Sequence, residues 1–395
     1  MTDRSRGGPR PGRATAAGLC ATLVGIGLAR FAYTPLLPAL IAEGWFPSSQ
    51  AAYLGAANLA GYLAGALGAR PLARRAAARA ILRVMMLLVA VAFLACAVPL
   101  SFAWFFLWRF ASGVAGGVVM VLAAPTVLPH VPAARRGLAG GAIFTGVGLG
   151  IAASGTVVPL LLEAGLAQTW CGLGLLSLLL TALAWGGWPA DLVPAAAEAA
   201  AGRSARRAPA LRALYAEYAL NAAGLVPHMV FLVDFIARGL RQGIGPGARY
   251  WVVFGAGAVA GPMVAGAIAD RVGFGLALRG AFAAQAAAVL LPTLATGPAA
   301  LSVSSLVVGA AVPGIVPLVL GRVHELVPGD PEGQRAAWSV TTMAFALGQA
   351  GAAYGFSFLY ARGGDYLPLF SLAAACLVLA LAVDLAARVA APRPI

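Results

Sequence analysis

The chain of 395 residues is 61% hydrophobic and only 10% charged, whereas about 25% of the residues in an ordinary soluble domain are charged. A soluble protein of this size could not hide so much apolar surface from water, so the composition excludes a soluble enzyme, a disordered chain and a secreted disulfide scaffold. The 27 basic residues are all arginine. Without lysine, the chain can form neither a Walker A phosphate loop nor a Schiff base.

Apolar runs of about 20 residues, the length of one helical membrane crossing, recur along the chain. They lack the period-two alternation of a β-barrel, so we predict an all-α polytopic membrane protein. The twelve predicted transmembrane helices cover 16–41, 51–69, 80–100, 103–127, 138–162, 170–188, 213–236, 249–269, 276–296, 299–321, 335–360 and 366–387. A hydrophilic stretch at 189–212 predicts a cytoplasmic linker between an N-terminal six-helix half, 1–188, and a C-terminal six-helix half, 213–395.

The positions of the arginines predict the orientation of the chain in a cell inner (plasma) membrane. With both termini in the cytoplasm, most arginines fall in cytoplasmic segments, as the positive-inside rule requires. The arginines left in outer loops are Arg238, Arg241, Arg249 and Arg362. The first three, between the seventh and eighth spans, run against the rule. We attribute the net charge of +14 to membrane orientation and expect no nucleic-acid partner.

A short pattern recurs in the loop after the second span of each half, at 65–70 and again at 266–273. It resembles the G-x-L-a-D-R-x-G signature of the major facilitator superfamily, although the first copy has Ala69 where the family has Asp. The matching residues are Gly266, Asp270, Arg271 and Gly273 in the second copy and Arg70 in the first. The resemblance implies a conformational lock that depends on Asp270.

Two further segments agree with this resemblance. The fourth span contains Arg109 in an R-x-x-x-G element, and the fifth carries glycines spaced as in an antiporter-type motif, namely Gly146, Gly150 and Gly155. That motif departs from the family pattern at Ile151 and Ser154. The segments GIGLARFAYTPLLPALI, AAYLGAANLAGYLAGAL and YALNAAGLVPHMVFLVDF are similar to the YbfB/YjiJ-type branch of the superfamily. The resemblance implies a transport role without indicating the substrate.

Ionisable side chains within the spans are the first candidates for function, because each costs about 2.5–3.5 kcal/mol at mid-bilayer on insertion scales. Arg30 lies near the middle of the first span and shares a helical face with Tyr33 and Thr34. It either lines a cavity, where it would attract an anionic group or a carboxylate, or it is a structural arginine bonded to backbone carbonyls.

The seventh span carries a polar stripe. Glu217, Asn221 and His228 are separated by 4 and 7 residues, which places them on one helical face together with Gly224. The stripe either relays a proton or binds a polar solute, or it makes hydrogen bonds between helices. Asp234 lies off the stripe, and we expect it to pair with Arg238, four residues on.

Weaker candidates for the substrate or proton pathway lie in other spans. They are Asn58, Tyr62, Arg109, Gln285, Gln349 and Tyr354. The four cysteines lie in apolar stretches without C-x-x-C spacing, so we expect no disulfide and no metal site, and nothing in the sequence calls for a cofactor.

These observations predict a secondary active transporter that moves a small organic solute across the bilayer by alternating access. We expect it to be coupled to protons and to work as a monomer, and the glycine pattern of the fifth span favours export. The alternatives are a membrane-embedded enzyme and a permease subunit that needs a separate ATPase partner. An enzyme has little support, because His324-Glu325 lacks the second histidine of a zinc-protease motif.

Overall fold

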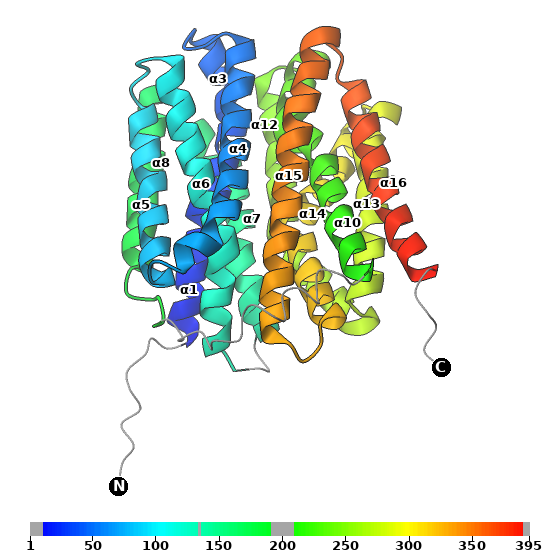
Figure 1. The fold of residues 1–395 in the computed structure, drawn as a ribbon. Helices are drawn as coiled ribbons and strands as arrows, with labels where there is room; N and C mark the ends of the chain where they lie inside the picture. Colours follow the sequence, from blue (N-terminus) through cyan, green and yellow to red (C-terminus); the bar gives the residue numbers. More distant parts are fainter. Residues whose placement is uncertain (1–10, 133–135, 191–208, 390–395) are drawn as a thin grey trace.

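The computed structural model describes residues 11–132, 136–190 and 209–389 as a bundle of roughly parallel helices, and these residues contain no β-strand (Figure 1). Within these described ranges, ten helical segments are long and apolar enough to cross a membrane. They are Pro11–Ala42, Ala78–Cys96, Phe102–His130, Ala139–Leu162, Leu166–Ala184, Pro209–Gly239, Gly245–Val272, Phe274–Leu294, Pro298–Leu326 and Leu367–Ala387. The chain therefore has the helical, multi-pass character that its composition predicts.

Two more long helices coincide with the second and eleventh predicted spans. Helix α4 (Ser48–Ala73) has 26 residues and α15 (Pro331–Gly363) has 33, but their sequences are less apolar than those of the ten segments. The count of twelve membrane crossings therefore remains a prediction. Most of the predicted linker, residues 191–208, lies outside the described part of the chain.

The other elements follow in chain order. They are α1 (Pro11–Thr22), η1 (Leu23–Leu28), α2 (Ala29–Phe31), α3 (Tyr33–Ala42), α5 (Ala78–Cys96), α6 (Phe102–Val127), η2 (Leu128–His130), α7 (Arg136–Leu162), α8 (Leu166–Ala184), α10 (Pro209–Val226), η4 (Pro227–Phe231), α11 (Leu232–Asp234), η5 (Phe235–Gly239), α12 (Ile244–Val272), α13 (Phe274–Leu294), α14 (Pro298–Leu326) and α16 (Leu367–Val389). The elements η1, η4 and η5 are π-helical turns, which interrupt the first and seventh predicted spans.

The N-terminal helices, α1 to α8, and the C-terminal helices, α10 to α16, meet mainly along two helix pairs. Helix α7 packs against α12, and α4 packs against α15, so these four helices occupy the middle of the bundle in Figure 1. The beginning of α1 and the end of α16 both lie at the lower end in that view, which we name the termini end. The opposite end is the far end.

Glycines allow the closest helix contacts. The backbones of η1 and α7 touch, and a Cβ at Gly27 would lie 2.8 Å from the Cα of Gly150. A Cβ at Gly146 would overlap the carbonyl of Leu19 in α1, and one at Gly155 would lie 3.3 Å from the indole of Trp251 in α12. The glycines of the fifth predicted span therefore serve close packing, both to the first span and across to the C-terminal helices.

This packing predicts that Gly150→Ala lowers the stability of the protein, because the added methyl would force two backbones apart, at a cost of about 1–3 kcal/mol. Gly141→Ala is the matched control in the same helix, because a Cβ there has no neighbour within 4 Å. Thermal unfolding in detergent should show a lower midpoint for Gly150→Ala alone. Equal midpoints for the two variants would contradict this account of the packing.

Candidate functional site

Arg30 of α2 lies where N-terminal and C-terminal helices meet. Its guanidinium carbon is 5.4 Å from the ring centre of Tyr62 in α4 and 5.6 Å from that of Phe31. Tyr218 of α10 is close enough to interact electrostatically with both Arg30 and Tyr62. The Nε and Nη2 atoms of Arg30 are buried, and within the described residues neither has a hydrogen-bond partner. A cation that has no counter-ion in the described part of the chain thus faces aromatic rings between the two groups of helices.

Tyr218 completes this site, although the sequence did not single it out. Its side chain is 1% exposed, and its ring centre lies 4.6 Å from that of Phe345 in α15. Its buried hydroxyl has no hydrogen-bond partner among the described residues. Tyr218 follows Glu217 directly, so it lies about 100° away from the polar stripe. Its importance depends on which face of α10 meets the N-terminal helices, and helical periodicity does not reveal that.

Arg109 and Asn58 bind the backbone near Arg30. Arg109 Nη1 donates to the Ala29 carbonyl at 2.8 Å, and its guanidinium lies 4.4 Å from the ring centre of Tyr33. Asn58 Nδ2 donates to Ser112 Oγ at 2.9 Å and to the Arg109 carbonyl at 3.2 Å. These bonds join α2, α4 and α6. They support a positioning role for Arg109 and Asn58 rather than direct contact with a solute.

Side chains of Thr34 and Trp251 form hydrogen bonds that join the N-terminal to the C-terminal helices. Thr34 Oγ1 donates to the Met229 carbonyl at 3.0 Å, and Trp251 Nε1 donates to Ser154 Oγ at 3.0 Å. Thr34 lies one helical turn beyond Arg30 toward the far end, and Met229 lies in the π-helical turn η4. Gln349 is buried and donates to the sulfur of Met229 at 3.4 Å. Thr34 and Gln349 therefore hold the bundle together beside Arg30.

The polar stripe of the seventh predicted span faces other C-terminal helices. Asn221 Nδ2 donates to Gln285 Oε1 in α13 at 2.7 Å. A Cβ at Gly224 would meet the side chain of Leu377 in α16. His228 is fully buried and lies 2.8 Å from Ser304 Oγ in α14. The residues do share one face, as the spacing predicts, but Asn221 and His228 make hydrogen bonds between helices.

The hydrogen bonds of Ser304 determine the tautomer of His228. Ser304 Oγ donates its proton to the Ala288 carbonyl at 2.6 Å. His228 Nε2 must therefore donate to Ser304, which leaves the proton on Nε2. The Nδ1 atom is buried without a partner among the described residues, and the ring lies edge-on to Phe370.

Glu217 lies near the middle of α10 and is 3% exposed, and no hydrogen bond or ion pair reaches it from the described residues. Three charged side chains on separate helices are close enough to interact with it electrostatically, namely Asp384, Arg322 and Arg279. Arg279 is paired with Asp384, and Arg322 Nη1 lies 2.8 Å from Glu325. Glu217 is thus a buried acid beside two ion pairs.

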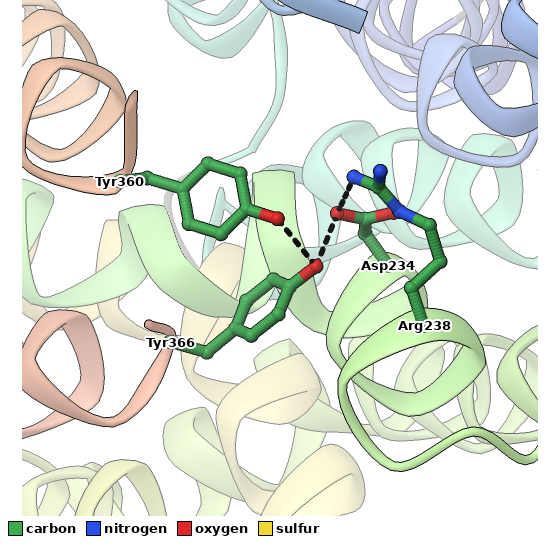
Figure 2. Close-up of polar contacts among 4 residues, drawn as sticks. All are labelled: Asp234, Arg238, Tyr360 and Tyr366. Carbon is green, nitrogen blue, oxygen red and sulfur yellow. Dashed lines mark hydrogen bonds and ion pairs between the residues drawn. The ribbon is translucent and has the colours of Figure 1, made fainter. Parts of the chain in front are cut away.

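At the far end, Asp234 binds Arg238 through both carboxylate oxygens, which confirms the pair that the sequence predicts. Figure 2 shows that Tyr366 also donates to Asp234, at 2.7 Å, and accepts a hydrogen bond from Tyr360 at 2.8 Å. This cluster ties the seventh predicted span to the end of α15 and the start of α16. Arg238, in a predicted outer loop, is therefore held by a specific partner.

The remaining candidates lie away from Arg30. Tyr354 is 37% exposed, near Tyr53. In the second signature copy Asp270 and Arg271 are exposed, and neither takes part in the three ion pairs of the described residues. The other signature residues are Arg70 near the end of α4, Gly266 in α12 and Gly273, whose φ of +81° forms the turn between α12 and α13. The lock remains a prediction.

A surface groove of about 430 Å³ runs along α6, and no candidate residue lines it. Its lining is Phe102, Ala103, Phe106, Leu107 and Phe110. Because this lining offers no polar side chain, the groove does not suit a polar solute. The described residues also contain no cluster of three or more His, Cys, Asp or Glu that could hold a metal ion.

The hydrogen bond from His228 Nε2 predicts a difference between two substitutions. His228→Gln places an amide N–H near the position of Nε2, whereas His228→Asn does not reach it. We expect His228→Asn to be less stable by about 1 kcal/mol, the usual net value of one hydrogen bond. Thermal unfolding in detergent measures this difference. Greater stability of the Asn variant would mean that the Nδ1 atom makes the structural bond.

No curated protein matches the chain. A family model described as "Uncharacterised MFS-type transporter YbfB" matches residues 22–385, which is nearly the whole described bundle. This confirms the resemblance drawn from the signature and from the first and seventh predicted spans. The chain belongs to this family of MFS-type membrane transporters.

Proposed function

We propose that the chain moves a small organic solute across the cytoplasmic membrane by secondary active transport with alternating access. It would work as a monomer of twelve transmembrane helices in two six-helix halves, 1–188 and 213–395, joined by the linker 189–212. The observation that carries this proposal is the position of Arg30 where N-terminal and C-terminal helices meet: it is a half-buried cation with two buried guanidinium nitrogens and no counter-ion among the described residues. Transporters built from parallel repeats bind their solutes at such an interface.

The energetics support a ligand at Arg30. An arginine at mid-bilayer costs about 2.5–3.5 kcal/mol on insertion scales. Aromatic rings beside a desolvated cation return about 2 kcal/mol or more for each good contact within about 6 Å, but the two ring contacts of Arg30, at 5.6 and 5.4 Å, lie near the outer limit of that range. A structural arginine would be bonded to carbonyls, as Arg109 is. The buried Nε and Nη2 atoms of Arg30 have no such partner among the described residues, which favours a role in binding.

The arrangement of contacts also supports alternating access. The bond between Thr34 and Met229 joins the two groups of helices one turn beyond Arg30, toward the far end. A single hydrogen bond of this kind in a membrane protein is worth about 0.6 kcal/mol on average, so thermal motion can break it. Because the arginines predict cytoplasmic termini, the far end would face the outside, and export would release the solute there.

We further propose that Glu217 carries the coupled proton. It is a buried acid without a hydrogen-bond partner among the described residues, and it is adjacent in sequence to Tyr218, which contacts the Arg30 site. Protonation would remove its repulsion with Asp384 and its attraction to Arg279 and Arg322. A change in the position of α10 would then move Tyr218, so proton binding and solute binding would be linked through one helix.

Reconstituted protein tests the coupling directly. In proteoliposomes with a pH gradient, we expect concentrative transport of the solute, because proton flow is the proposed driving force. A protonophore should reduce the transport to equilibration. Inside-out and right-side-out orientations, compared in the same assay, distinguish export from import. Transport at an unchanged rate after collapse of the gradient would contradict proton coupling.

Substitution of Glu217 tests its role in more detail. Glu217→Gln mimics the protonated acid, so we expect loss of gradient-driven accumulation while solute exchange under equal concentrations continues. Glu163→Gln, at the exposed end of α7, is the matched control and should behave like the parent protein. If Glu217→Gln still accumulates the solute with unchanged pH dependence, the proton is carried elsewhere.

A further inference from the structure

We infer that the solute is an organic anion whose carboxylate, or an equivalent anionic group, binds the guanidinium of Arg30. This inference rests on the proposed transport function and narrows it to one chemical class. The site also contains the rings of Phe31, Tyr62 and Tyr218, which suit a flat or apolar body attached to the anionic group.

The sequence supplies no acid among the N-terminal helices that could neutralise Arg30. From residue 11 to residue 188, the acidic residues are Glu43 and Glu163. Glu43 follows the end of α3, and Glu163 follows the end of α7, so both lie at helix ends, whereas Arg30 lies in the interior of its span. The charge on Arg30 therefore has no partner from its own side of the interface.

Two buried acids of the C-terminal helices bind partners other than Arg30. Asp234 is bound by Arg238 and Tyr366, and Asp384 is bound by Arg279. Glu217 is the buried acid that remains, and the charges that influence it are those of Asp384, Arg322 and Arg279 rather than Arg30. Both sides of the interface thus leave Arg30 positively charged and without an acidic partner.

Donor groups near Arg30 fit the same ligand. The buried Nε and Nη2 atoms of Arg30 and the buried hydroxyl of Tyr218 all lack hydrogen-bond partners among the described residues. A guanidinium presents two parallel N–H groups to a carboxylate, and a phenol hydroxyl can donate a third hydrogen bond. An amine would face an uncompensated positive charge, so the site disfavours cations.

Charged thiol reagents test the sign of the electrostatic potential at the site, and the test does not require that the solute be known. The native cysteines are first replaced by serine, and Tyr218→Cys or Phe345→Cys is then introduced in the full-length protein. Each variant is treated with methanethiosulfonates that carry an anionic sulfonatoethyl, a cationic trimethylammonioethyl or a neutral hydroxyethyl group. We expect the anionic reagent to react about tenfold faster than the cationic one, after correction for their rates with free thiol, because Arg30 attracts it.

The same measurement in Arg30→Gln should remove this preference, whereas Arg83→Gln, an arginine that stacks on Trp185 away from the site, should leave it unchanged. Size-exclusion chromatography shows whether each cysteine variant is folded. If one of the two variants fails to fold, the other still allows the measurement. Three results would overturn the inference: equal or cation-favouring rates, a preference that survives Arg30→Gln, and no reaction with any reagent at either position.

Transport assays separate this inference from the proposed function. For any transported carboxylate, we expect its primary amide to be transported at least tenfold more slowly, and Arg30→Gln to remove the difference. Transport of a cationic or neutral solute in preference to anions would overturn the inference and leave the transport function intact. An anion-selective site with no gradient-driven transport would instead overturn the proposed function.

Discussion

The absence of water in the bilayer core is the constraint on which this structure depends. Polar groups there must find partners inside the protein or remain costly. Most buried polar side chains described above obey this constraint locally: Asn221 binds Gln285, and Arg109 binds the Ala29 carbonyl. Arg30 does not. Among the described residues, Arg30 is a cation without a counter-ion between the two groups of helices, and we interpret its position as the place where a ligand completes the structure.

The helices around Arg30 show how such an exception is held in place. Gly27 and Gly150 bring η1 and α7 into backbone contact just before Arg30. Arg109 of α6 donates to the Ala29 carbonyl, and Asn58 of α4 donates to Ser112 Oγ and to the Arg109 carbonyl. The segment that carries Arg30 is thus fixed on the N-terminal side. The hydrogen bonds across the interface, such as the one from Thr34 to Met229, are individually weak, which suits an interface that opens and closes.

Much of the helical framework could be predicted from the sequence. Long apolar runs gave the positions of helices to within a few residues, as for the fourth predicted span, 103–127, against α6 at Phe102–Val127. The π-helical turns at Leu23–Leu28 and Pro227–Phe231 were not foreseen. A π-helical turn shifts the register of the backbone hydrogen bonds locally. Hydropathy depends only on composition, so it cannot detect such a shift.

The candidate site was predicted only in part, for a physical reason. Composition singles out a charged residue in a membrane span, so Arg30 and Glu217 were evident. Composition does not indicate which neighbouring helix each face of a helix packs against. His228 therefore appeared equivalent to Glu217, although it binds Ser304 within the C-terminal helices, and Tyr218 was passed over. Predicting those contacts requires the rotation of each helix about its axis, which is set by packing against several other helices at once.

Distance measurements between spin labels test the central claim, alternating access around Arg30, most directly. One label pair spans α4 and α15 near the far end, at Ser49 and Arg362, and another spans the same helices near the termini end, at Arg74 and Arg335; all four positions are exposed. Between acidic and neutral pH, with and without solute, the account predicts that one distance lengthens while the other shortens. Distances that stay fixed, or that change in the same direction at both ends, would contradict it.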